Sequence, residues 1–180
     1  MTEKHGDNAL IESAVIVPLY RDDDGEVRLV IVRRVDGGPH GGQLAFPGGK
    51  FSDGDATLFD TALRETHEEI GLAPDAVDVL KRLEPIDTVT TGFVIIPFLA
   101  RIVRPLEWKR SESEITEILE VPLRHFADPA IHDEEMRSFV GLPTPIRIPF
   151  YRIGNWELWG ATYRILHPLL PRLFAEEWEI

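Results

Sequence analysis

Two apolar segments near the start of the chain are separated by a short acidic turn, and this pattern constrains the fold more than any other. Ala14–Tyr20 and Val27–Arg34 are rich in branched apolar residues, and the tetrapeptide DDDG lies between them. Branched apolar residues favour strands, whereas Asp and Gly favour tight turns. The segments therefore predict a β-hairpin that must bury at least one face in a core.

The rest of the chain alternates between expected strands and helices. Strands are expected at Val77–Leu83, Gly92–Val103, Ile115–Val121, Ile146–Ile153 and Trp156–Trp159, and helices at Asp55–Ile70, Leu123–Ala127 and Ala161–Glu177. Gly71 is a stop signal for the first long helix, and Pro168 and Pro171 interrupt the last one. This order predicts an α/β (α+β) fold in which a mixed β-sheet lies between helices.

Length and cysteine content narrow the organisation of the chain. We expect residues 1–10 to be a flexible polar lead-in and residues 11–180 to form one domain, since 180 residues suffice for a substantial core. The absence of cysteine excludes disulfides and thiolate metal sites. The lead-in has no apolar signal segment, and the apolar run near Val94–Val103 is too short to span a membrane. We therefore expect a cytoplasmic protein with no membrane contact.

The formal charge of −12 limits the expected partners. General nucleic-acid binding requires a basic surface, so we expect no nucleic-acid partner. A phosphorylated small molecule is compatible with this charge if a metal ion supplies positive charge at the site.

The sequence RETHEEIGL, residues 64–72, places three glutamates near the end of the predicted helix. At about 100° per residue, Glu65, Glu68 and Glu69 gather beside a core-facing side that consists of Phe59, Ala62, Leu63, Thr66 and Ile70. Like charges at this spacing repel, and the helix dipole disfavours anions at this end. The cluster is therefore either a solvated acidic face or a site for a hard cation such as Mg²⁺ or Mn²⁺.

A glycine-rich loop precedes this helix. Val35–Lys50 contains six glycines and two prolines and ends in FPGGK. The paired glycines at 48 and 49 indicate either a plain tight turn or a place where the backbone passes close to another group. In the second case a backbone carbonyl there could become a further metal ligand.

Together, FPGGK and RETHEEIGL resemble the signature of the Nudix hydrolase family. That signature is a Gly, five residues, a Glu, seven residues and then R-E-U-x-E-E-x-G-U, where U is a bulky apolar residue. The residues that match are Arg64, Glu65, Glu68, Glu69, Gly71 and Leu72. Thr66 replaces an apolar residue, and 14 residues separate Gly49 from Arg64, one more than is common. Asp55 stands near the place of the first Glu.

The resemblance implies a Nudix-type α/β/α sandwich with a mixed β-sheet, and it implies roles for individual residues. The implied metal ligands are Glu65, Glu68, Glu69 and the carbonyl of Gly48, and Arg64, Gly49 and Gly71 would support them. Glu69 and Glu68 are catalytic candidates. Some members use a later loop glutamate as general base, which here indicates Glu114, with Glu112 as its competitor.

A second resemblance, to the coenzyme A pyrophosphatase subgroup, concerns the segment before FPGGK. The subgroup pattern is L-L-T-x-R-S, three residues, R, three residues, G, three residues, F-P-G-G. Leu29, Arg33, Gly42 and Phe46–Gly49 match it in register, whereas Ile31, Arg34 and Gly38 differ from it. The expected substrate contacts are Arg33, Arg34, His40, Gln43, Phe46 and Phe93. His40 and Gln43 are equally consistent with a plain loop, and Phe93 with a core aromatic.

These resemblances imply an enzyme that uses Mg²⁺ or Mn²⁺ to cleave the pyrophosphate between a nucleoside and another group. The expected substrate is coenzyme A or acyl-CoA, with 3′,5′-ADP and a phosphopantetheine as products. ADP-ribose, NADH or a dinucleoside polyphosphate are alternative substrates. A different alternative is a non-catalytic nucleotide-binding module. A small-molecule nucleotide is thus the expected partner, and a homodimer remains open.

Overall fold

The structure is a computed structural model that describes residues 11–37, 40–88, 92–140 and 142–180. The lead-in of residues 1–10 and the departure at Gly38 lie outside the described residues. Within the described part of the chain, no helix is long and apolar enough to cross a membrane.

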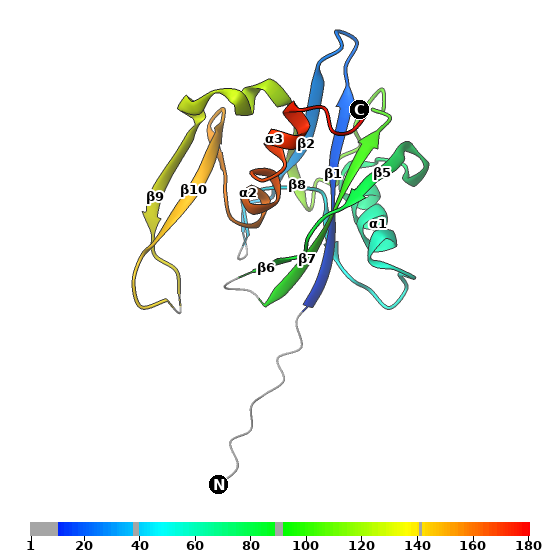
Figure 1. The fold of residues 1–180 in the computed structure, drawn as a ribbon. Helices are drawn as coiled ribbons and strands as arrows, with labels where there is room; N and C mark the ends of the chain where they lie inside the picture. The colour runs from blue at the N-terminus through cyan, green and yellow to red at the C-terminus, as the bar shows by residue number, and fades with distance from the viewer. Residues whose placement is uncertain (1–10, 38–39, 89–91, 141) are drawn as a thin grey trace.

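A mixed sheet forms the middle of the molecule (Figure 1). Its strands are β1 (Ile11–Arg21), β2 (Val27–Arg34), β3 (Leu44–Ala45), β4 (Gly48–Lys50), β5 (Val77–Arg82), β6 (Ile86–Asp87), β7 (Phe93–Ile102) and β8 (Ile115–Pro122). The main order is β3-β2-β1-β7-β5, and β4, β6 and β8 add to β1, β7 and β2. β1 and β7 run parallel over their length, while β1 and β2 are antiparallel.

The predicted hairpin is confirmed. Leu19 of β1 pairs with Leu29 of β2. In the turn, Oδ1 of Asp22 accepts the backbone N–H groups of Asp24 and Glu26 at 3.1 and 2.8 Å. The side chain of Asp22 thus serves as the acceptor for two backbone N–H groups of the turn.

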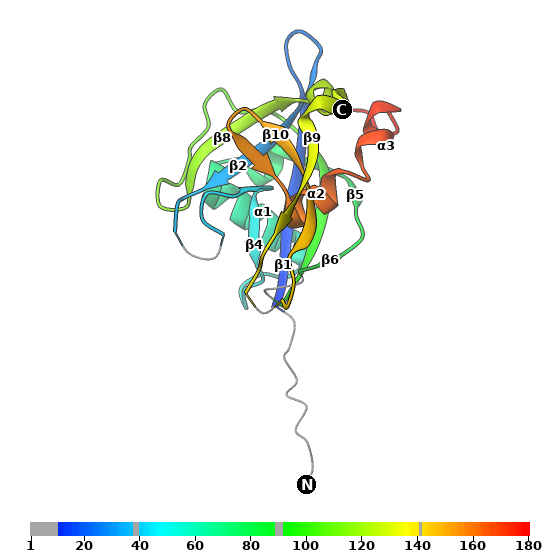
Figure 2. The same ribbon diagram turned by 90° about the vertical axis from the view of Figure 1, so that its left-hand side faces the viewer.

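Helices cover both faces of this sheet. α1 (Leu58–Ile70) lies on one side, and α2 (Gly160–Leu166) and α3 (Leu170–Phe174) lie on the other (Figures 1 and 2). A second, antiparallel sheet of β9 (His132–Arg137), β10 (Ile146–Ile153) and β11 (Trp156–Leu158) stands beside α2. Three short 3₁₀ helices complete the described elements: η1 (Pro74–Ala76), η2 (Leu123–Ala127) and η3 (Pro129–Ile131). The predicted α+β sandwich with a mixed sheet is confirmed.

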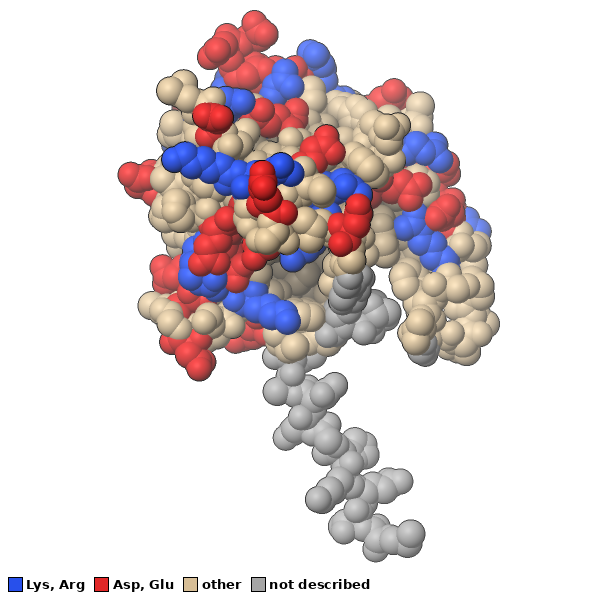
Figure 3. Space-filling view, turned by 180° about the vertical axis from the view of Figure 1, so that it is seen from behind, with Lys and Arg blue, Asp and Glu red and all other residues tan. Residues whose placement is uncertain are grey.

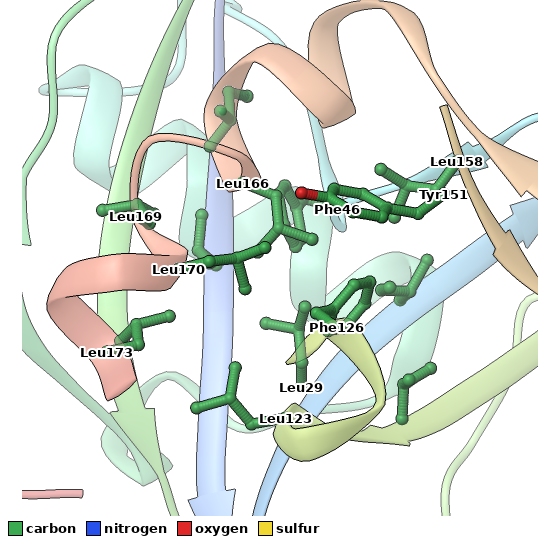
Figure 4. Packing of buried hydrophobic residues seen from close by; sticks show 14 of the residues in the cluster. Leu29, Phe46, Leu123, Phe126, Tyr151, Leu158, Leu166, Leu169, Leu170 and Leu173 are labelled. Atoms are coloured by element: carbon green, nitrogen blue, oxygen red, sulfur yellow. The ribbon is translucent and has the colours of Figure 1, made fainter. Parts of the chain in front are cut away.

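Strand alternation in β2 divides the core between the two layers. Leu29 and Ile31 are buried in the cluster that includes α2 and α3, whereas Val30 and Val32 are buried in the cluster at the end of α1. Figure 4 shows the first cluster. Full burial of one such side chain contributes about 1.5–3 kcal/mol, so both faces of β2 are firmly held.

Several elements differ from the sequence prediction. The short strands β3 and β4 lie within the segment expected to be a loop, and β6 was not predicted. The first long helix begins at Leu58 and not at Asp55, because the side chain of Thr57 caps it by accepting the N–H of Asp60 at 3.2 Å. The last helix is two short helices, separated near Pro168. β9 was not predicted, because most residues of its sequence HDEEMR are polar or charged and its place depends on backbone pairing with β10.

Acidic and basic side chains are intermixed on the molecular surface. On the face in Figure 3, Lys and Arg side chains lie next to Asp and Glu side chains instead of forming one continuous basic area. This face therefore offers no extended basic surface of the kind that general nucleic-acid binding requires.

Candidate active site

The three glutamates of α1 lie at different depths. The side chain of Glu69 is 2% exposed, that of Glu65 is 21% exposed and that of Glu68 is 54% exposed. The helix therefore does not present a uniformly solvated acidic face. Glu68, Glu65 and Glu69 form a row, called the acidic row below, that runs in this order from the surface into the protein.

Glu69 is fixed at its inner position by backbone and side-chain donors. The N–H of Gly48 donates to its Oε2 at 3.0 Å, and Nη1 of Arg34 donates to its Oε1 at 3.2 Å. Burial raises the pKa of Glu69 to about 7, and the charges of Glu65 and Glu114 act in the same direction, against the two donors. Glu69 is thus a buried carboxylate whose negative charge is incompletely balanced.

The two glycines of FPGGK allow the loop to pack against different neighbours. Gly48 has a φ of 145°, and a Cβ there would lie 2.2 Å from the carbonyl oxygen of Ala14 in β1. A Cβ at Gly49 would lie 2.4 Å from the carboxyl carbon of Glu65. Gly48 therefore lets β4 pair with β1, and Gly49 makes room for the carboxylate of Glu65. Gly71 ends α1 with a φ of 71°.

Asp55 has a clear structural role although it lies outside the helix. It accepts from Nε and Nη2 of Arg64 at 2.8 and 3.0 Å, from the hydroxyl of Thr61 at 2.8 Å and from the N–H of Ser52 at 3.0 Å. The guanidinium of Arg64 holds the pKa of Asp55 well below its usual range. Asp55 therefore lies in the loop before α1 and orients Arg64.

Arg64 connects this loop to the acidic row. Its Nη1 donates to Glu65 at 2.9 Å and to Glu68 at 3.2 Å, and its Nη2 donates to the carbonyl of Lys50 at 3.2 Å. Together, Arg64 and Arg34 occupy oxygens of all three acids.

If the acids bind the metal ion that the Nudix resemblance implies, replacing Asp55 with asparagine is expected to weaken metal binding while sparing kcat at saturating metal. Asparagine has one side-chain oxygen, so it cannot accept Nε and Nη2 of Arg64 on two separate oxygens as Asp55 does. Arg64 then binds Glu65 and Glu68 more closely and competes with a cation for their oxygens. We expect the Mg²⁺ concentration for half-maximal activity to rise by about tenfold. Asp60→Asn, which removes the same charge from the first turn of α1, is the control. An unchanged Mg²⁺ requirement would contradict this role of Asp55.

The segment before β8 brings Glu114 toward the end of α1. The N–H of Ser111 donates to the carbonyl of Glu69 at 2.9 Å, and the N–H of Val35 donates to the carbonyl of Glu114 at 2.8 Å. The side chain of Glu114 is exposed, and its charge helps to raise the pKa of Glu69. Glu112 instead pairs loosely with Arg110 at 3.8 Å and is 87% exposed. Glu114 is therefore the better placed of the two candidate bases.

The structure separates the two adjacent arginines that were expected to contact substrate. Arg34 reaches Glu69 on the α1 side of the sheet, whereas Arg33 stacks on the ring of Trp156 at 4.1 Å and pairs with Asp36 at 2.7 Å. Gly42 packs on this pair, since a Cβ there would lie 2.9 Å from Oδ1 of Asp36. The pairing of Arg34 with Glu69 was not predicted, although alternation along β2 places Arg33 and Arg34 on opposite faces of the sheet.

The remaining expected substrate contacts are dispersed. His40 and Gln43 contact each other at 3.3 Å, and His40 is exposed. Phe93 is half-buried beneath the ammonium group of Lys50, 5.1 Å from the ring centre. Phe46 is 2% exposed and packs in the core beside Tyr151 and Leu166 (Figure 4). Its side chain is therefore part of the core, which differs from the substrate contact expected from the sequence.

The donor set of the acidic row suits a divalent metal ion. All of its groups are oxygen donors, which Mg²⁺ and Mn²⁺ prefer, and buried Glu69 lacks a full counter-charge. Within the described ranges, no group of three or more His, Asp and Glu side chains is arranged to hold a metal ion. Arg34 and Arg64 hydrogen-bond to oxygens of the three glutamates, so these oxygens are shared with guanidinium groups.

Comparisons with known proteins agree with this geometry. Residues 10–140 match the NUDIX domain. The chain is 39% identical over 169 residues to an uncharacterized Nudix hydrolase, NudL, of Salmonella newport, which covers 88% of this chain and 80% of the relative. A MutT/nudix family protein from Enterococcus faecalis has a similar fold, with a TM-score of 0.62, 17% identity and coverage of 97% of this chain and 66% of that one.

Two further structures of similar fold are an Ap4A hydrolase from C. elegans and the NUDIX domain of NrtR from Shewanella oneidensis in complex with ADP ribose. The first has a TM-score of 0.53, 18% identity and coverage of 64% of this chain and 82% of that chain. The second has a TM-score of 0.53, 16% identity and coverage of 70% and 81%. With the family match and the NudL relative, the conclusion is that this chain belongs to the Nudix family and is a hydrolase of the pyrophosphatase type.

Proposed function

We propose that this protein is a Mg²⁺- or Mn²⁺-dependent pyrophosphohydrolase that cleaves coenzyme A or acyl-CoA. The observation that carries the proposal is the position of buried Glu69, bonded to the backbone of Gly48 beside the acids Glu65 and Glu114. The glutamates here carry more negative charge than Arg34 and Arg64 offset, so an anionic substrate is disfavoured unless a cation is bound first.

In this proposal, Glu65, Glu68, Glu69 and the carbonyl of Gly48 hold the metal. A bound Mg²⁺ or Mn²⁺ neutralises the pyrophosphate and lowers the pKa of a bound water. Glu69, Glu68 and Glu114 are the candidates to take the proton of the attacking water. Asp55 anchors Arg64, so Arg64 stays in place beside Glu65 and Glu68 when these acids turn from it to the ion.

The substrate assignment is supported by the subgroup pattern and by how its residues lie. Arg33 and Gly42, two matching positions, pack around Asp36. Two positions of the subgroup pattern thus lie beside the same residue, Asp36. Hydrolysis adds one water across the pyrophosphate and yields 3′,5′-ADP and phosphopantetheine, or acyl-phosphopantetheine from acyl-CoA.

A second candidate substrate is ADP-ribose, with NADH and dinucleoside polyphosphates in the same class. The direction of Arg33, which lies against Trp156 and away from the acids of α1, favours it. An arginine held there is not beside the place where the pyrophosphate would be cleaved.

A substrate panel tests this proposal. Purified protein with Mg²⁺ or Mn²⁺ is assayed against coenzyme A, acetyl-CoA, ADP-ribose, NADH and diadenosine tetraphosphate, and products are identified by chromatography. We expect the highest kcat/KM for coenzyme A or its acyl form and release of 3′,5′-ADP. A preference for ADP-ribose would reject the coenzyme A assignment, and no turnover of any compound would reject the proposed function.

A further inference from the structure

Arg34 occupies an oxygen that the proposed metal ligand Glu69 would need. Its Nη1 lies 3.2 Å from Oε1 of Glu69, which is the oxygen not bonded to the N–H of Gly48. A guanidinium in contact with this carboxylate repels a divalent ion at the same place. Arg34 and a metal ion therefore compete for Glu69.

The two partners differ in their freedom to move. Glu69 is 2% exposed and is held from α1 and from the backbone of Gly48. The side chain of Arg34 is 39% exposed and, within the described residues, makes this single hydrogen bond. Arg34 is therefore the partner that moves when Glu69 binds an ion.

Arg64 is the other arginine that contacts the acidic row, and its side chain is less free to move than that of Arg34. It donates twice to Asp55 and once to the carbonyl of Lys50, so it remains anchored when Glu65 and Glu68 turn to other partners. Release of Arg34 thus places a mobile guanidinium beside the acidic row. A guanidinium binds a phosphate through paired charge-assisted hydrogen bonds.

We propose that Arg34 is an exchangeable counter-charge: it pairs with Glu69 until a divalent ion binds there and then turns to a phosphate of the substrate. The inference rests on the proposed function, which supplies the metal ion and the phosphate. The exchange couples the two binding events, because metal binding frees the group that the phosphate requires.

Calorimetry on two variants tests the exchange of Arg34, because it measures ligand binding and does not depend on hydrolysis of a substrate. Arg34→Met removes the charge and keeps an unbranched side chain. Arg101→Met is the control, because Arg101 is also a strand arginine, 42% exposed, and pairs with exposed Asp78 at 2.6 Å. Titrations are run at pH 9, where Glu69 is ionised in wild type, first with Mg²⁺ alone and then with methylenebisphosphonate, a pyrophosphate analogue, at saturating Mg²⁺.

Two opposite effects are expected for Arg34→Met. Mg²⁺ should bind several-fold more tightly, because its competitor is gone, while the bisphosphonate should bind at least about tenfold more weakly, because a charged hydrogen bond is lost. Arg34→Lys should restore part of the bisphosphonate affinity, and Arg101→Met should match wild type in both titrations.

Other results would overturn the exchange. Weaker Mg²⁺ binding by Arg34→Met would mean that Arg34 only positions Glu69, and unchanged bisphosphonate affinity would mean that Arg34 does not reach a phosphate. A wild type that binds no Mg²⁺ would overturn the exchange and the metal site together. A wild type that binds both ligands but hydrolyses nothing in the substrate panel would count against the proposed function alone.

Discussion

Replacing Glu69 with glutamine is expected to lower kcat for pyrophosphate cleavage by about 10²- to 10⁴-fold, the range for loss of an acid–base group. Glutamine has the same shape and still accepts the N–H of Gly48, so the loop and α1 stay in place. Steady-state kinetics at saturating Mg²⁺ measure the effect, and Glu84→Gln, on an exposed residue between β5 and β6, is the control. A loss of less than tenfold would show that Glu69 is not part of the catalytic site.

The same replacement is expected to stabilise the metal-free protein at neutral and alkaline pH. Burial raises the pKa of Glu69 from 4.5 to about 7, so the folded protein binds more protons than the unfolded chain between these values. Stability therefore falls as pH rises through this window, by about 3 kcal/mol in total, and the cost is fully present above pH 7. Glutamine does not ionise and avoids this cost.

Urea unfolding in the presence of EDTA measures this effect. We expect Glu69→Gln to be more stable than wild type at pH 8 and similar to it at pH 4. Equal stability at pH 8 would contradict the raised pKa. A variant that is both inactive and more stable would show that the buried charge is kept for function at the expense of stability.

Replacing Gly49 with alanine is the second change with a large expected effect. The new Cβ would lie 2.4 Å from the carboxyl carbon of Glu65, and this flexible side chain must move away. Displacement of a catalytic group by about 1 Å can cost about 10²-fold in rate, so we expect a loss of this size. The fold should tolerate the change, with a melting temperature close to that of wild type.

Gly48→Ala should instead lower the stability of the fold strongly, which Gly49→Ala should not. Its Cβ would meet the backbone of Ala14 and Val15 at 2.2 and 2.6 Å, and a φ of 145° strains any side chain. Because backbone atoms in β1 cannot move aside, we expect destabilisation of about 4 kcal/mol or more. Thermal unfolding and kinetics on both variants separate the two glycines. A well-folded, fully active Gly49→Ala would show that Glu65 does not depend on this close approach.

Local patterns in the sequence were sufficient to predict most of the fold. The hairpin turn at Asp22–Gly25 and the end of α1 at Gly71 follow from the preferences of individual residues, so they could be predicted without tertiary contacts. The start of α1 was predicted three residues early, because Thr57 caps the helix and Asp55, which lies before it, bonds instead to Arg64, nine residues later.

The residues of the site could be predicted from the sequence better than their positions relative to one another. Helical periodicity placed Glu65, Glu68 and Glu69 together, but it does not reveal that Glu69 alone is buried. That burial depends on Gly48 and on Arg34, which come from β4 and β2. Phe46 belongs to a motif that suggests ligand contact, yet its bulk fills the core beside α2. Such contacts depend on how distant strands pack.

We expect the acids at the end of α1 to hold a divalent ion once they release their arginines. Titration of Mn²⁺, followed by electron paramagnetic resonance of the free ion at pH 8 without substrate, tests this expectation most directly. Wild type should bind Mn²⁺ saturably, and the double variant Glu65→Gln/Glu69→Gln should lose most of that binding. Equal Mn²⁺ binding by both proteins would contradict it.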